Sequence, residues 1–82
     1  MEKSKEEIIE ILKNELYSAL KYIKLAEESA KVGMKGIAID FLENAQVAYD
    51  CICKRQEKEN IKRYNTDLIY EEIERVYEII KN

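Results

Sequence analysis

Apolar residues recur every three or four positions through most of the chain, which is the spacing of one face of an α-helix. The first series comprises Ile8, Leu12, Leu16, Ala19, Ile23, Ala26 and Ala30. Ser4 stands before it as an N-cap type, with Glu7 three residues on, which is the pattern of a capping box. Gly33 follows it and suits the left-handed residue that ends many helices. The sequence therefore predicts a helix over residues 5–32.

Two further series predict two more helices. The second comprises Ala38, Leu42, Ala45, Ala48, Tyr49 and Ile52, and the apolar rhythm continues at Ile61 and Tyr64. We therefore expect a helix over about 35–63. The segment Asn65–Asp67 consists of good N-cap types that are poor helix formers, so it marks a break. The third series comprises Ile69, Ile73, Val76 and Ile80, and it predicts a helix over 66–81.

These elements predict an all-α fold, an antiparallel three-helix bundle in a single domain spanning residues 1–82. The short turn around Gly33 joins the first two helices as an antiparallel hairpin. The third helix is about half as long and runs back along that hairpin. Leu16 and Ile73 each lie in the middle of a stripe, so both are expected to be deeply buried.

The difference in helix length predicts an uncovered groove. If the third helix starts beside the far end of the second, its length of roughly 20 Å reaches only half of a hairpin roughly 40 Å long. It then covers the part of the hairpin formed by Ile8, Leu12, Leu16 and Ile52, and it stops before the region from Ala26 to Ala45. The residues expected around the uncovered groove are Tyr22, Leu25, Val32, Met34, Ile37 and Phe41. We expect another protein, or a second copy in a homo-oligomer, to cover this candidate interaction surface. The alternative is that the second helix ends early, near Gln56, so that the third helix is longer and covers the whole hairpin.

Composition adds limits on the surroundings and partners. The chain has 38% charged residues, 46% hydrophobic residues, no Pro and a formal net charge of −3. This balance gives no general attraction to nucleic acid or to anionic lipid. The charged start and the absence of a long apolar run predict neither a secretory signal nor a membrane span. The expected location is the cytoplasm.

The sequence offers little catalytic chemistry. It contains no His, the commonest general base and a frequent metal ligand. Cys51 and Cys53 lie about 200° apart around a helix, so they cannot pair with each other. No glycine-rich phosphate loop is present either. We therefore expect no enzyme activity, no cofactor and no metal site.

One local cluster of positive charge deviates from the acidic average. Lys54, Lys58 and Lys62 are spaced by four residues and share one face of the predicted second helix. Such a candidate basic patch could contact phosphates. Glu57 and Glu59 interrupt it, and no base-reading motif accompanies it, so a solvated face is the preferred interpretation.

The hairpin also resembles known helix pairs. The stretch from Ala26 to Ala38 places Ala near the end of one helix and Gly33 in the turn, and Leu42 and Ala45 follow it. This arrangement is similar to a tetratricopeptide-type helix pair and to the first two helices of microtubule-interacting-and-transport (MIT) domains. Both families bind peptides or partner helices in grooves between helices. The resemblance implies architecture and groove binding along the hairpin and the third helix.

The leading hypothesis is a small non-catalytic protein–protein interaction module, an adaptor or regulator that acts through a helical face. The presence of six Tyr and only one Phe supports this hypothesis, because Tyr suits surfaces that are partly apolar and partly exposed to solvent. One alternative is a phage- or mobile-element-type inhibitor that sequesters a host complex. The other is weak nucleic-acid binding through the cluster from Lys54 to Arg63.

Overall fold

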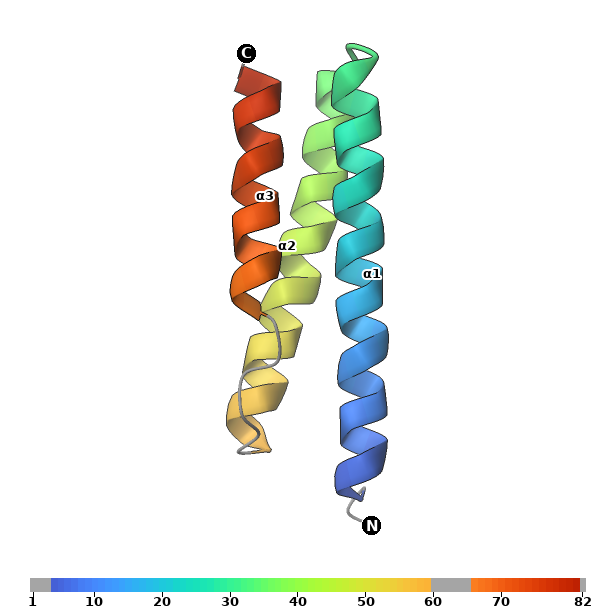
Figure 1. Ribbon diagram of the computed structural model, residues 1–82, viewed down its shortest axis with the longest axis vertical. Coiled ribbons are helices and arrows are strands. Elements are labelled where there is room, and N and C mark those ends of the chain that lie inside the picture. The colour runs from blue at the N-terminus through green and yellow to red at the C-terminus, as the bar shows by residue number, and fades with distance from the viewer. Residues whose placement is uncertain (1–3, 60–65, 82) are drawn as a thin grey trace.

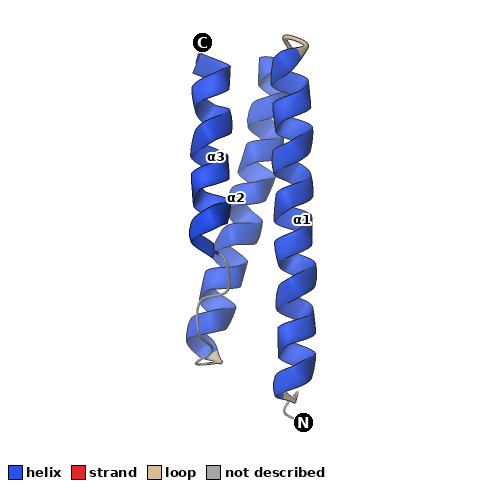
Figure 2. Cartoon of the chain, in the orientation of Figure 1, coloured by secondary structure: helices blue, strands red, loops and turns tan. Residues whose placement is uncertain are grey.

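Three helices form the part of the chain that the computed structural model describes, residues 4–59 and 66–81. They are α1 (Lys5–Lys31), α2 (Lys35–Lys58) and α3 (Thr66–Lys81), as Figures 1 and 2 show. The helices run antiparallel in sequence order and form a rod of 47 × 18 × 13 Å. The expected all-α antiparallel three-helix bundle is therefore confirmed.

Local sequence signals define the two ends of α1. The Ser4 hydroxyl accepts a hydrogen bond of 3.2 Å from the backbone N–H of Glu7, as an N-cap does. At the other end, Gly33 has φ +84° and donates its N–H to the Ala30 carbonyl at 3.1 Å. Met34 donates to the Ser29 carbonyl at 2.9 Å, which completes a Schellman motif. The chain therefore reverses within three residues, and α2 begins at Lys35.

The core lies along the seam where the three helices meet. On α1 and α2 many of its residues are Ala, and the small side chains let the two helix axes approach closely. α3 contributes larger aliphatic side chains from one face. The buried hydrophobic residues are Ile8, Leu12, Ala19, Ile23, Ala26, Ala38, Leu42, Ala45, Ile52, Ile69, Ile73, Val76 and Ile80.

The end of α2 differs from the expectation. The helix ends at Lys58 with Glu59 as its C-cap, whereas the apolar rhythm predicted a helix to about residue 63. The continuation of that rhythm at Ile61 and Tyr64 lies outside the described residues. The predicted end near residue 63 therefore also falls outside the described residues, whereas the polar positions from Lys54 to Lys58 are part of the helix.

The position of α3 corrects the predicted groove. Its C-terminal end lies level with the α1–α2 turn, and its N-terminal end lies beside the middle of α2 (Figure 1). Arg75 reaches Glu27 near the turn end of α1, and Tyr70 packs on Tyr49 in the middle of α2. α3 therefore lies along the turn half of the hairpin, the half that was expected to be uncovered. The expectation failed because α3 does not start beside the last turn of α2.

The two residues expected in the deep core have different outcomes. Ile73 is buried, as predicted, whereas Leu16 is only half-buried. Leu68, in the first turn of α3, lines a groove together with Leu20, one turn beyond Leu16. α3 therefore starts too far along α1 to enclose the Leu16 side chain.

Candidate functional site

The candidate interaction surface divides into two parts in the structure. Val32 and Met34 lie in the exposed turn, with Val32 70% exposed. Tyr22 and Phe41 are stacked across α1 and α2, with ring centroids 6.4 Å apart, and both are half-buried against the core. The structure therefore places Tyr22 and Phe41 on the flank of the hairpin and not around an open end.

That flank is a continuous surface, which we call the hairpin face. Each helix contributes a stripe with spacings of 4, 3, 4, 3 and 4 residues, the heptad pattern of a coiled-coil seam. Both stripes contain apolar, small and polar residues. The stripe on α1 comprises Ile11, Glu15, Ser18, Tyr22, Leu25 and Ser29, and the stripe on α2 comprises Ile37, Phe41, Asn44, Ala48, Cys51 and Arg55.

Contacts across the two helices show that the stripes are neighbours. Arg55 donates through Nε and Nη2 to Glu15 Oε1, at 3.1 and 3.0 Å. Ile11 and Ala48 line a shallow hollow together, near the N-terminal end of the α1 stripe. With the Tyr22–Phe41 stack near the turn, these contacts extend the hairpin face over most of the length of α1.

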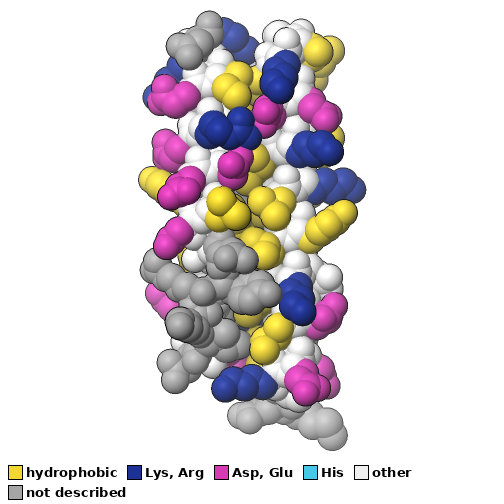
Figure 3. Space-filling view, viewed as in Figure 1, with side chains coloured by type: hydrophobic (Ala, Val, Ile, Leu, Met, Phe, Trp, Pro, Cys, Tyr) yellow, Lys and Arg dark blue, Asp and Glu magenta, His cyan; other side chains and the backbone are white. Residues whose placement is uncertain are grey.

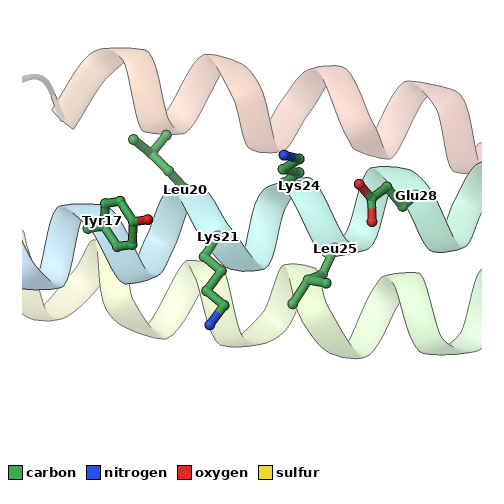
Figure 4. Close-up of a pocket in the computed structure, with 6 residues that line it drawn as sticks. All are labelled: Tyr17, Leu20, Lys21, Lys24, Leu25 and Glu28. Atoms are coloured by element: carbon green, nitrogen blue, oxygen red, sulfur yellow. The ribbon is translucent and has the colours of Figure 1, made fainter.

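The hairpin face points away from α3. In Figure 4, Leu20 and Lys24 point from α1 toward α3, whereas Lys21 and Leu25 point to the side on which α2 lies. Leu25 belongs to the hairpin face, so this view separates the two sides of α1. A layer of two helices has two broad faces, and α3 covers only one of them.

Sequence reasoning found part of this surface and missed the rest. Tyr22, Leu25, Ile37 and Phe41 were identified because they are large and apolar. Apart from Ile11, the remaining members are small or polar, and their signal was the regular 4, 3 spacing rather than their hydrophobicity. The polar stretch at the end of α2 also hid Gln56, which continues the apolar stripe four residues after Ile52 and is buried.

The structure describes two of the three residues of the candidate basic patch. Lys54 and Lys58 are exposed on α2, one turn apart, while Lys62 lies outside the described residues. Arg55, between them in sequence, is bound to Glu15 and faces the hairpin. The described part of the cluster is therefore a pair of lysines on the last turns of one helix.

A second surface lies on the opposite side of α1. Leu20, Ile23, Lys24, Leu68 and Arg75 line a groove between α1 and α3, together with two carboxylates. Figure 3 shows this side of the molecule, with apolar side chains between the two helices and charged ones around them. A hollow on the outer side of α1 adjoins the groove and is lined by Tyr17, Leu20, Lys21, Lys24, Leu25 and Glu28.

Ion pairs cross the groove at its turn end. Arg75 Nη2 lies 2.6 Å from Glu27 Oε2 and 2.7 Å from Glu72 Oε2, and Lys31 lies 3.3 Å from Glu27. The hydrogen bond from Arg75, and then that from Lys31, lowers the pKa of the Glu27 carboxyl. The hydrogen bond to Glu27, and then that to Glu72, raises the pKa of the Arg75 guanidinium. This network connects α3 to α1 by charge.

The described residues provide few groups for chemistry. Among residues 4–59 and 66–81, no cluster of His, Cys, Asp or Glu has the arrangement needed to hold a metal ion. In the same ranges, no helix is both long and apolar enough to cross a bilayer. What these residues do offer is surface, namely the hairpin face and the groove between α1 and α3.

Comparison with known proteins gave no match to a protein-family model, to a curated protein or to a solved structure. The resemblance to tetratricopeptide-type and MIT helix pairs therefore stays a prediction.

Proposed function

We propose that this protein is a non-catalytic interaction module that associates with a second copy of itself through the hairpin face. The observation that carries the proposal is the pair of heptad-spaced stripes on neighbouring helices, on the side that α3 leaves uncovered. In this spacing, side chains of one helix fit between those of a facing helix. A second hairpin has the same spacing and can supply the missing layer.

The charges of the hairpin face favour a second copy as the partner. Its two ionic side chains, Glu15 and Arg55, are bound to each other at 3.0 Å. Two such faces therefore meet without unpaired like charges, which would otherwise oppose self-association. Ser18 and Ala48 near the middle are small and allow the backbones to approach.

The size of the face is also adequate. α1 has 27 residues and α2 has 24, so the hairpin is about 36–40 Å long at 1.5 Å per residue. Two adjacent helices, each about 10 Å wide, give a face of roughly 800 Å². This is about the area that each partner buries in a stable protein complex of standard size.

The test is the oligomeric state of matched variants, measured by sedimentation equilibrium. Ile37 is 47% exposed on the hairpin face, and Val47 is 61% exposed on a different face of α2. We expect the parent to dimerise, Ile37→Glu to be monomeric, and Val47→Glu to dimerise like the parent. A parent that stays monomeric up to about 1 mM would contradict the proposal, because even weak specific association appears there.

A second variant protects this test against misfolding. Ser18→Arg adds a bulky charge at the centre of the hairpin face, at an exposed position that contributes nothing to the core. We expect a monomer with the helical circular-dichroism signal of the parent. A dimer as strong as that of the parent in this variant would place the interface elsewhere.

The nucleic-acid alternative receives less support. In the part of the cluster that the structure describes, Lys54 and Lys58 are two exposed charges, and Arg55 is already engaged by Glu15. Two phosphate contacts give only weak, salt-sensitive binding. We expect no specific shift of DNA or RNA by the parent, and strong binding that Lys54→Glu and Lys58→Glu together abolish would favour the alternative.

A further inference from the structure

The hairpin face has two unlike halves. Beside the turn it carries large side chains, including the Tyr22–Phe41 stack and Leu25. At the far end it carries charge, because Arg55 donates two hydrogen bonds to Glu15 there. A second copy that meets this face must therefore match an apolar half and a charged half.

The ion pair in the charged half is incompletely satisfied. Arg55 uses Nε and Nη2 on a single carboxylate oxygen, Glu15 Oε1, at 3.1 and 3.0 Å. The other oxygen, Oε2, is shielded from solvent and accepts no hydrogen bond from any residue that the structure describes. A buried carboxylate oxygen without a donor is unfavourable, so a further donor at this point is stabilising. The Nη1 of a second guanidinium, which its own pair leaves unused, has the chemistry required.

A two-fold dimer can bring two hairpin faces together in two ways. With the axis parallel to the helices, both turns lie at the same end, and α1 of one copy faces α2 of the other at the same level. With the axis across the helices, the turns lie at opposite ends, and each helix faces its own copy with the order of its stripe reversed. The two arrangements place the ion pair against different side chains.

The reversed arrangement leaves the ion pair without a charged partner. The second position of the α1 stripe then faces the fifth, so Glu15 meets Leu25 of the other copy. The last position of the α2 stripe faces the first, so Arg55 meets Ile37. An ion pair buried against aliphatic side chains loses its hydration and gains no new interaction.

The arrangement with both turns at the same end matches like with like. Glu15 then faces Arg55 of the other copy, and Arg55 faces the other copy's Glu15, since the two residues lie at one level. Four charges of alternating sign adjoin, which is electrostatically favourable. The apolar halves beside the turns also meet each other.

We propose that Glu15 and Arg55 select both the partner and its orientation in the dimer. This inference rests on the proposed dimer through the hairpin face. The two copies pack with their turns at the same end, and Arg55 of each copy donates to the open Oε2 of Glu15 in the other. A helix pair without matching charges at this level leaves the ion pair desolvated and unmatched. The network therefore favours a second copy of this chain over other apolar helices.

Subunit exchange between the parent and a charge-swapped variant tests the selection. Glu15→Arg combined with Arg55→Glu keeps an intramolecular ion pair of reversed polarity and the same net charge. This variant should dimerise with itself, whereas a mixed dimer places Glu against Glu and Arg against Arg. In exchange followed by resonance energy transfer between labelled copies, we expect mixed dimers at least about tenfold below the statistical share. The matched control, Lys13→Glu with Glu74→Arg, reverses two exposed charges outside the hairpin face and should mix freely with the parent.

Spin labels at the turn test the orientation independently. The turn lies at one end of the rod (Figure 1), and Met34 is 54% exposed there. Met34→Cys, in a background of Cys51→Ser and Cys53→Ser, accepts a nitroxide label whose distance to the label in the other copy is measured by pulsed dipolar spectroscopy. We expect roughly 20–30 Å, because packed helix layers lie about 10 Å apart and the labels add their own length. Turns at opposite ends would instead separate the labels by about the length of the rod, 47 Å.

The outcomes separate this inference from the proposed dimer. Suppose that the parent dimerises and that Ile37→Glu abolishes the dimer. Statistical mixing with the charge-swapped variant, a swapped variant that is helical but monomeric, or the long label distance would then overturn the inference and leave the dimer standing. A monomeric parent would overturn both. Circular dichroism and sedimentation equilibrium establish the fold and the dimer of the labelled background, and the label distance decides alone if the swapped variant does not fold.

Discussion

The two glycines near the turn should respond to the same substitution with opposite sign. Gly33 has φ +84°, in the left-handed region, whereas Gly36 lies in the first turn of α2. A Cβ added at either position meets no other atom within 4 Å, so steric crowding does not distinguish them. The difference between Gly33→Ala and Gly36→Ala is therefore purely one of backbone conformation.

The magnitudes follow from that difference. An L-residue held in the left-handed region costs about 1–2 kcal/mol. Replacing Gly by Ala also lowers the conformational entropy of the unfolded chain, which stabilises the fold by about 0.4–1 kcal/mol and offsets part of that cost. Gly33→Ala should therefore destabilise the fold by about 1 kcal/mol. At Gly36 the backbone is helical, so Ala is favoured there by about 0.5–1 kcal/mol. In a domain of this size, 1 kcal/mol corresponds to about 4–8 °C in Tm.

Thermal and urea unfolding, followed by far-UV circular dichroism at one fixed protein concentration, measures both changes. The fixed concentration matters because association raises apparent stability by mass action. We expect Gly33→Ala to lower Tm and Gly36→Ala to leave it unchanged or raise it. A shift of both variants in the same direction would refute the assignment of the left-handed residue to Gly33.

Two further predictions concern the core and the link between α3 and α1. Ile73→Ala should cost about 2–5 kcal/mol because Ile73 is fully buried, whereas Leu16→Ala should cost only about 1–2 kcal/mol. Equal losses in urea unfolding would contradict the placement of α3. A double-mutant cycle of Glu27→Ala and Arg75→Ala should give a coupling of about 0.5–1 kcal/mol near neutral pH, because the pair is reached by solvent. Arg75, and then Lys31, lowers the pKa of Glu27 in the folded protein. The coupling is therefore fully present above the unfolded pKa of 4.5, and it is lost as pH falls through the lower folded pKa. A coupling that persists in strong acid would contradict this assignment.

The sequence by itself determined the elements whose signals are local. The start of α1 follows from a Ser4 hydroxyl that reaches an N–H three residues away. The turn follows from a single residue able to adopt positive φ. The inward face of α3 was predicted at all four positions, because a helical repeat identifies its own buried side. Such interactions join residues within one or two turns, so a pattern along the chain contains them.

Only the tertiary structure decided where α3 lies. The stripe of Ile69, Ile73, Val76 and Ile80 fits either half of the hairpin equally well, since both halves offer a continuous apolar seam. The choice depends on where α2 ends and on contacts between distant residues, such as that of Arg75 with Glu27, which no local spacing encodes. The same choice determines the site. With α3 beside the turn half, Tyr22 and Phe41 belong to the opposite flank of the hairpin, and a separate groove opens between Leu20 and Leu68.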